Sequence, residues 1–180
     1  MRHASMMKKI VLITIVLFCA VGVSAHATSF GRLLYADIAA IDGEPAICLP
    51  IDAKEGFSVG WITLSESYVR NAGVWGLALK AGAQPLVLRS GDCIVYGVVP
   101  AGYELENYKN NGAPLKLNAN STYVFRLSSS YQATDTYRAV FCVSERSDGT
   151  RTFIQYALST GEGEVIPICD GRLNANKPGR

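Results

Sequence analysis

The stretch LKLNANSTYVFRL, residues Leu115 to Leu127, places a polar cluster between two leucines and a segment with strand-like alternation. The cluster, Asn118 to Thr122, contains four polar residues and one alanine. Asn, Ser and Thr side chains hydrogen-bond to nearby backbone and tolerate turn conformations. In the segment that follows, every second side chain is Tyr, Phe or Leu, as in a strand with one face in a core. The stretch therefore predicts a tight corner that leads into a β-strand.

Leu117 and Tyr123 lie six residues apart across this polar corner. The same spacing occurs at the tyrosine corner of fibronectin-type and immunoglobulin-like sandwiches, where the tyrosine hydroxyl bonds back to backbone at the corner. We predict that Tyr123 fixes a turn of the chain between two sheets. The alternative is an ordinary hairpin loop that happens to contain a tyrosine.

The rest of the chain repeats short apolar runs, alternation and turn residues at the spacing typical of an all-β sandwich or barrel. We predict one immunoglobulin/fibronectin-like β-sandwich over residues 28–171, followed by a flexible tail over 172–180. Trp61 is expected in its core, whereas Trp75 fits either the core or an interface. A helix around residues 74–80 is the weaker alternative to a strand because Gly73 and Gly76 disfavour it. Predicted strands include 32–41, 45–51, 57–65 and 74–80, with a hairpin joined at Ser147 to Gly149 and a short last strand that carries Cys169.

The N-terminus has the three parts of a secretory signal peptide. A basic start is followed by the apolar run IVLITIVLFCAVGV and then by small residues suited to cleavage. We predict a signal peptide over residues 1–27, cut after Ala27, with Ala25 as the alternative site. Cys19 follows Phe18 rather than a small residue and precedes no polar spacer, so we expect no lipid anchor and no stable membrane anchor.

Removal of this segment changes both the charge and the cysteine count. Of 17 basic residues, three leave with the signal, so 14 remain against 15 acidic ones and the net charge becomes −1. The basic character of the full chain is therefore no sign of nucleic-acid binding. Four cysteines remain, an even number that in an exported protein indicates two disulfides. Three pairings are possible, and we predict Cys48–Cys93 and Cys142–Cys169.

The residue types needed for catalysis and metal binding are scarce. Both histidines, His3 and His26, lie within residues 1–27. A mature chain without histidine has no Ser-His-Asp or Cys-His site and lacks the commonest metal ligand. Glu104 with Glu106, and Glu162 with Glu164, could form a glycosidase-type carboxylate pair, although solvated loops explain them more simply. We predict no enzymatic activity, no catalytic residue, no metal site and no cofactor.

A set of phrases, AICLPI, VLRSGDCIVYG, the Tyr123 corner and YRAVFCV, occurs in this order between about Ala46 and Val143. In order and spacing, the set resembles a family of small exported bacterial proteins described as immunity proteins of type VI secretion, often periplasmic lipoproteins. The resemblance implies a periplasmic protein that blocks a secreted effector toxin by binding it. The chain departs from the lipoprotein members at Cys19.

Tyrosine-containing segments rich in Asn, Ser and Gly have the composition of protein-binding loops. We expect partner contacts in such loops, at Tyr103, Glu104, Tyr108 and Tyr131. Two other functions fit an exported, disulfide-bonded β domain: an adhesive or surface-assembly module and a periplasmic lysozyme inhibitor. Self-association would favour the first of these, and direct inhibition of lysozyme would favour the second.

Overall fold

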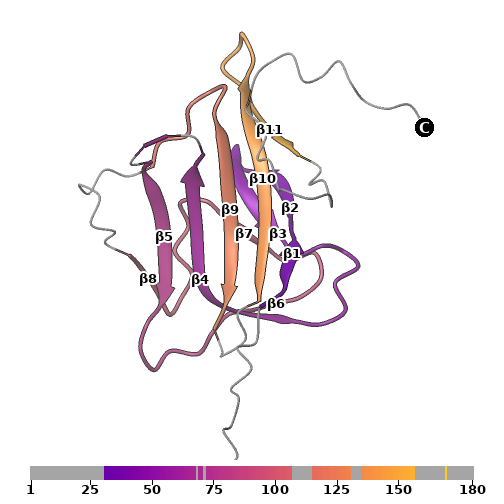
Figure 1. The fold of residues 1–180 in the computed structure, drawn as a ribbon, viewed down its shortest axis with the longest axis vertical. Helices are drawn as coiled ribbons and strands as arrows, with labels where there is room; N and C mark the ends of the chain where they lie inside the picture. Colours follow the sequence, from indigo (N-terminus) through magenta and orange to yellow (C-terminus); the bar gives the residue numbers. More distant parts are fainter. Residues whose placement is uncertain are drawn as a thin grey trace, which may run out of the picture.

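The computed structural model describes residues 31–67, 69–70, 72–106, 115–130, 135–156 and 169 of the 180-residue chain. These residues form eleven strands, without a helix, in two sheets (Figure 1). The prediction of an all-β fold with two sheets is confirmed. The predicted signal peptide and the predicted C-terminal tail lie outside the described residues.

The large sheet contains eight strands in the order β1-β10-β9-β4-β5-β8, with β11 beside β10 and β6 beside β4. All its neighbouring strands are antiparallel except β1 and β10, which run parallel. The alternation expected from the sequence produces the long central strands. The strands are β1 (Leu33–Tyr35), β4 (Phe57–Glu66), β5 (Val74–Leu79), β6 (Val87–Leu88), β8 (Tyr103–Leu105), β9 (Thr122–Ser129), β10 (Thr136–Glu145) and β11 (Arg151–Gln155).

The small sheet has the order β2-β3-β7, formed by β2 (Asp37–Ile41), β3 (Glu44–Cys48) and β7 (Cys93–Val95). The single strand predicted over 32–41 is wrong, because its first part joins the large sheet and its second part the small one. The change occurs at Ala36, a buried residue whose N–H still donates to Arg138 of β10. Gln155 of β11 holds the crossing in place, since its side-chain amide accepts from Ile38 N–H and donates to the Ala36 carbonyl, each at 2.7 Å.

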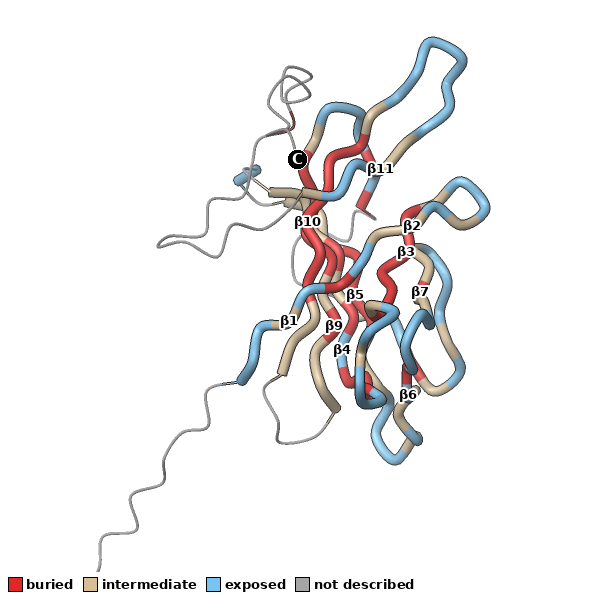
Figure 2. The backbone as a smooth tube through the Cα atoms, turned by 90° about the vertical axis from the view of Figure 1, so that its right-hand side faces the viewer, coloured by how far each residue is buried: buried red, intermediate tan, exposed pale blue. Residues whose placement is uncertain are grey.

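The hydrophobic core lies between the two sheets, as the side view of the chain shows (Figure 2). Side chains from β9, β10 and β4 form its centre, and Ile47 of β3 packs onto them from the small sheet. The aromatic rings of Tyr123 and Phe141 stack with centroids 5.8 Å apart. Trp75 is buried and meets Tyr96 and Phe125 edge-on, so it belongs to the core.

The corner at Leu117 to Tyr123 is held by hydrogen bonds of the tyrosine hydroxyl. Tyr123 is fully buried, and its hydroxyl accepts a hydrogen bond from Asn118 N–H at 2.7 Å and donates one to the Lys116 carbonyl at 3.3 Å. Asn120 has a φ of 60°, in the left-handed region that Asn tolerates. The tyrosine hydroxyl thus bonds back to the backbone of the corner. The predicted passage between two sheets is not seen, because β8 before the corner and β9 after it both belong to the large sheet.

Both predicted disulfides are present. Cys48 and Cys93 lie directly opposite each other on β3 and β7, with Cα atoms 4.0 Å apart. Cys142 of β10 joins Cys169, with Cα atoms 5.3 Å apart. Two disulfides indicate an oxidising environment of the extracellular type.

The expectation that Trp61 lies in the core is wrong, because β4 contains an irregularity that reverses its faces. The register between β4 and β9 shifts between Val59 and Trp61. Phe57 and Val59 are buried before the shift, and Ile62 and Leu64 are buried after it. Such a bulge inserts one residue and moves every later side chain to the opposite face. Trp61 therefore points away from the core and is 46% exposed.

Candidate interaction surface

We use the term outer face for the face of the large sheet that points away from the small sheet. Cross-strand register arranges its side chains in two neighbouring rows, because residues directly opposite in a sheet share a face. The first row contains Leu33, Thr136, Ser128, Trp61, Ala78 and Glu104. The second row contains Tyr35, Arg138, Arg126, Thr63 and Gly76.

Three large apolar side chains in these rows are open to solvent. Leu33 is 47%, Tyr35 45% and Trp61 46% exposed. Trp61 is the unusual member because β4 is an interior strand with β9 on one side and β5 on the other. We call the two rows the open half of the outer face; within them Arg138 is buried, at 8% exposed.

A buried strip of the outer face adjoins the second row on β9 and β10. Val124 and Val140 point to the same side as Arg126, yet they are at most 2% exposed. Cys142 is also on this side and is bonded to the buried Cys169. This buried strip bounds the open half, and beyond it Ile154 of β11, opposite Cys142, is 39% exposed.

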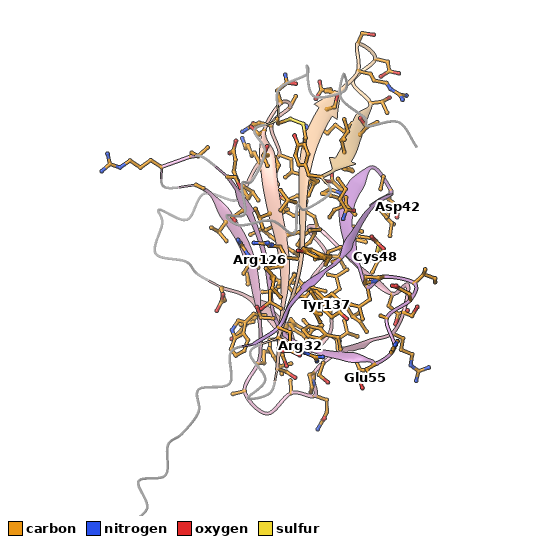
Figure 3. All side chains as sticks on the ribbon, turned by 45° about the vertical axis from the view of Figure 1, so that its right-hand side comes forward. Arg32, Asp42, Cys48, Glu55, Arg126 and Tyr137 are labelled. Atoms are coloured by element: carbon orange, nitrogen blue, oxygen red, sulfur yellow. A yellow bond between two sulfur atoms is a disulfide. The ribbon has the colours of Figure 1, made fainter. Side chains whose placement is uncertain are left out.

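Two arginines lie side by side in the open half. Arg126 of β9 and Arg138 of β10 are directly opposite each other (Arg126 is labelled in Figure 3). Burial lowers the pKa of both guanidinium groups, and the neighbouring Arg138 lowers that of Arg126 further. Among the described residues the Arg126 guanidinium forms no hydrogen bond or ion pair. We call Arg126 and Arg138 the arginine pair.

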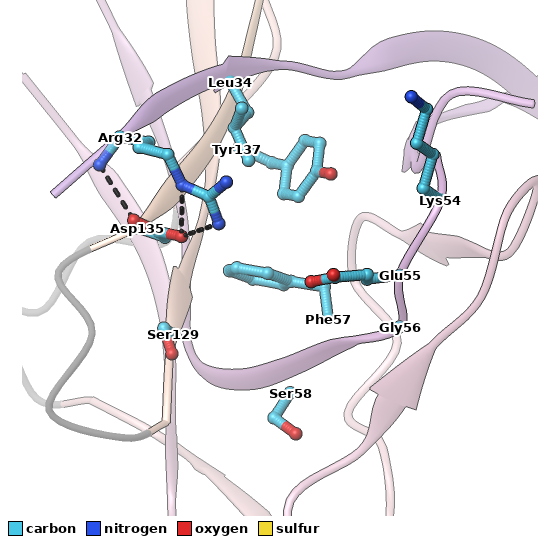
Figure 4. A pocket seen from close by; sticks show the side chains of 10 residues that line it. All are labelled: Arg32, Leu34, Lys54, Glu55, Gly56, Phe57, Ser58, Ser129, Asp135 and Tyr137. Carbon is cyan, nitrogen blue, oxygen red and sulfur yellow. Dashed lines mark hydrogen bonds and ion pairs between the residues drawn. The ribbon is translucent and has the colours of Figure 1, made fainter. Parts of the chain in front are cut away.

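A pocket of about 470 Å³ lies where β1 and β10 meet the chain segment that enters β4 (Figure 4). Phe57 and Tyr137 form an edge-to-face aromatic pair in it, with ring centroids 5.0 Å apart. On one side, Arg32 donates to the Asp135 carboxylate through its backbone N–H and two guanidinium nitrogens, at 2.7 to 3.0 Å. The side chains of Lys54 and Glu55 lie across the pocket from this pair (Figure 4). The pocket lining thus combines an aromatic pair with charges of both signs.

One carboxyl group of this pocket, that of Asp135, is held in its ionised form. The hydrogen bond with Arg32 is the main cause that lowers the pKa of Asp135, so its carboxyl group is ionised at neutral pH and is a poor general acid. The described residues contain no group of three or more His, Cys, Asp or Glu side chains that could hold a metal ion. In the same part of the chain, no helix is long and apolar enough to cross a membrane.

The sequence-predicted contact residues have different positions in the structure. Tyr103 lies in β8 and is only 2% exposed, so its predicted loop position is wrong. Its hydroxyl donates to the Val59 carbonyl at 2.6 Å and accepts from Leu86 N–H at 3.1 Å, a structural role. Glu104 is exposed in the first row of the outer face. Tyr108 and Tyr131 lie outside the described residues.

Most residues of the open half were not identified as a site from the sequence. Arg126 carried a usable signal, because its position in YVFRL places it on the face opposite Tyr123. Trp61 could have been assigned to this face only by recognising Gly60 as the site of a bulge. Without a bulge, the alternation of residues along β4 places Trp61 on the same face as Phe57 and Val59, and therefore in the core.

Comparison of the chain with family models, with curated proteins and with solved structures returns no match. The resemblance to type VI immunity proteins therefore stays a prediction.

Proposed function

We propose that this protein is a non-enzymatic binding domain that engages a partner protein through the open half of the outer face. The observation that supports this proposal is the exposure of Trp61, 46% of whose surface is open to solvent on an interior strand. Trp, Tyr and Arg are enriched among the residues that dominate binding energy at interfaces. Trp61, Tyr35 and Arg126 lie together in the open half.

The specific function we propose is that of a periplasmic immunity protein, which binds a secreted effector toxin and blocks it. The N-terminal pattern of an export signal and the two disulfides support an extracytoplasmic location. A face built on a hydrogen-bonded sheet is already ordered before binding, which limits the entropy lost on association. Blockade by binding requires no catalytic group in this protein.

A contact-dependent competition experiment tests this function. The gene is deleted in the producing bacterium, and the mutant is grown on a surface with its parent strain. The mutant is complemented with the wild-type gene, with Trp61→Ser or with Ile51→Ser. Ile51→Ser is the control, because it removes an apolar side chain that is 83% exposed but lies outside the open half. We expect the wild type and Ile51→Ser to restore survival, and Trp61→Ser to fail although the protein is exported and folded.

Full protection by Trp61→Ser would show that the open half is not the immunity surface. Equal survival of the uncomplemented mutant would contradict the immunity function itself. Sedimentation equilibrium and a lysozyme turbidity assay would then distinguish an adhesive module from a lysozyme inhibitor.

A further inference from the structure

Strand β1 is an edge of the large sheet, and part of its backbone is unpaired. Its pairing with β10 uses alternate residues, because the Arg32 carbonyl accepts from Thr136 N–H and Ala36 N–H donates to β10, each at 2.9 Å. In such a ladder the N–H and C=O groups of the residues in between point the other way. Those of Leu33 and Tyr35 form no hydrogen bond in the described part of the chain. Both residues therefore offer a donor and an acceptor to an extended segment.

The side chains on this edge do not protect it from pairing with another chain. Natural edge strands usually carry charged residues, proline or a bulge that prevents such pairing. In β1 the exposed side chains are instead Leu33 and Tyr35, which are 47% and 45% open to solvent. Strand addition, in which an extended segment of another protein joins a sheet, uses an open backbone edge of this kind.

The pocket beside β1 lies where an added strand would place a side chain. Leu34 points to the inner side of the sheet, because successive residues of a strand alternate and its two neighbours in β1 are on the outer face. It lines the pocket together with the Phe57–Tyr137 aromatic pair (Figure 4). Side chains directly opposite each other in a sheet share a face. A residue paired with Leu34 would therefore extend into the pocket.

The lining of the pocket favours a large apolar side chain. The aromatic pair forms an apolar wall. The charges of Arg32 and Asp135 are matched to each other by two guanidinium hydrogen bonds, at 3.0 and 2.7 Å. The opposite wall carries one charge of each sign, at Lys54 and Glu55. The pocket thus has no excess charge that would select an acidic or a basic side chain.

We propose that β1 is a strand-addition site, where an extended segment of the partner protein pairs antiparallel with β1 and inserts a large apolar side chain, opposite Leu34, into the pocket. This inference rests on the proposed function, because the segment belongs to the protein that binds the open half. Leu33 and Tyr35 are the outermost members of the two rows of that surface. In antiparallel pairing each of them exchanges both of its backbone hydrogen bonds with the added strand. The outer side chains of that strand then continue the rows.

The test is a titration of the isotope-labelled protein, without its predicted signal peptide, with the blocked peptide Lys-Thr-Val-Phe-Val-Thr-Lys. Amide signals are followed by NMR. The phenylalanine is the pocket residue, and a second peptide has glycine in its place. A third peptide is N-methylated at both valines, whose amides face β1 in the proposed register. A fourth is N-methylated at both threonines, whose amides face away from β1.

We expect the amide signals of Leu33 and Tyr35 to shift, and the glycine peptide to bind at least about ten-fold more weakly because the burial of an aromatic side chain is lost. Methylation of the valines should weaken binding about ten-fold or more, and methylation of the threonines less than about two-fold. Leu33→Pro removes an unpaired N–H of β1 and should weaken binding at least about three-fold. Leu105→Pro is the matched control and should leave binding unchanged, because it removes an exposed leucine from β8 at the other edge of the sheet.

Three results would overturn the proposal. The first is the absence of any shift at Leu33 and Tyr35 with about 5 mM peptide, a concentration that detects even millimolar affinity. The second is an equal loss of binding on methylation of either pair of residues, which would show that the peptide binds without backbone pairing. The third is a shift of the same amides with protein concentration alone, which would assign the edge to a second copy of the chain. The methylated peptides decide the question on the wild type if Leu33→Pro changes signals outside β1.

The competition experiment separates this inference from the proposed function. If the peptide does not pair with β1 but Trp61→Ser fails to protect cells, the function stands and the strand-addition site is wrong. If the peptide pairs with β1 but the uncomplemented mutant survives as well as its parent, the site is correct and the immunity function is wrong.

Discussion

Substitution of Gly60 by alanine should destabilise the protein, because the bulge of β4 leaves no room for a side chain. A Cβ atom at Gly60 would lie 2.7 Å from the Ser130 Cα and 2.8 Å from the Ser129 carbonyl oxygen. Both neighbours are backbone atoms, so relief requires a shift of the chain between β9 and β10. Overpacking of this kind costs about 1–3 kcal/mol, and the lower entropy of an unfolded alanine returns about 0.4–1 kcal/mol. We expect the free energy of unfolding to fall by about 1–2 kcal/mol.

The assay is equilibrium unfolding in guanidinium chloride with the disulfides intact, followed by tryptophan fluorescence. The matched control is Gly73→Ala, since a Cβ atom there would meet Leu115 no closer than 3.4 Å, an ordinary contact. Gly73→Ala should leave the free energy of unfolding unchanged or raise it slightly. If Gly60→Ala proved as stable as Gly73→Ala at the same denaturant dependence, the close approach at the bulge would be incorrect, and so would our explanation of the exposed Trp61.

Two other substitutions test the corner and the ion pair. Tyr123→Phe should lower the free energy of unfolding by about 1–2 kcal/mol, because Asn118 N–H loses its hydroxyl acceptor and the Lys116 carbonyl loses its donor. The measurement is urea unfolding. A change below a few tenths of a kcal/mol would show that the corner does not depend on the hydroxyl. The hydrogen bond from Arg32 is the main cause that lowers the pKa of Asp135 in the folded protein. Its contribution to the free energy of unfolding is therefore fully present at pH values above the pKa in the unfolded chain, near 3.8, and is lost as the pH falls through the lower pKa of the folded protein. Asp135→Asn should therefore be less stable than wild type at pH 7 and should approach it at pH 2–3 in the same unfolding assay, whereas a constant difference at both pH values would exclude this linkage.

Local sequence patterns predicted the parts of the fold that local chemistry determines. The polar corner before Tyr123 and the Asp42-Gly43 turn depend on residues close in the chain, and both are present. The two disulfides were also predicted with the correct partners. The prediction of an all-β chain followed from alternation, which is again a local property.

The features that the sequence did not predict depend on contacts between distant segments. The point at which the chain leaves the large sheet, Ala36, is stabilised by Gln155, a residue distant in sequence whose side chain hydrogen-bonds to the backbone at Ala36 and Ile38. Tyr103 becomes a core residue because its hydroxyl reaches Val59 of β4 and Leu86. Neither contact can be predicted from the neighbouring residues in the sequence. The loop-like composition around Tyr103, for example, is the same whether its ring is buried in the core or exposed to solvent.

The open half of the outer face was missed for a related reason, and that reason bears on its function. The core of this domain is consistent at every level, from alternation to packing and hydrogen bonding. Trp61 is a local exception, since a large aromatic side chain on an interior strand is more stable with its apolar surface covered. In a protein that otherwise obeys these rules, such an exception supports the proposal that this face contacts another molecule. The Gly60 bulge supplies the mechanism, because it moves Trp61 out of the core and into the row beside Arg126 without disturbing the buried Ile62 and Leu64.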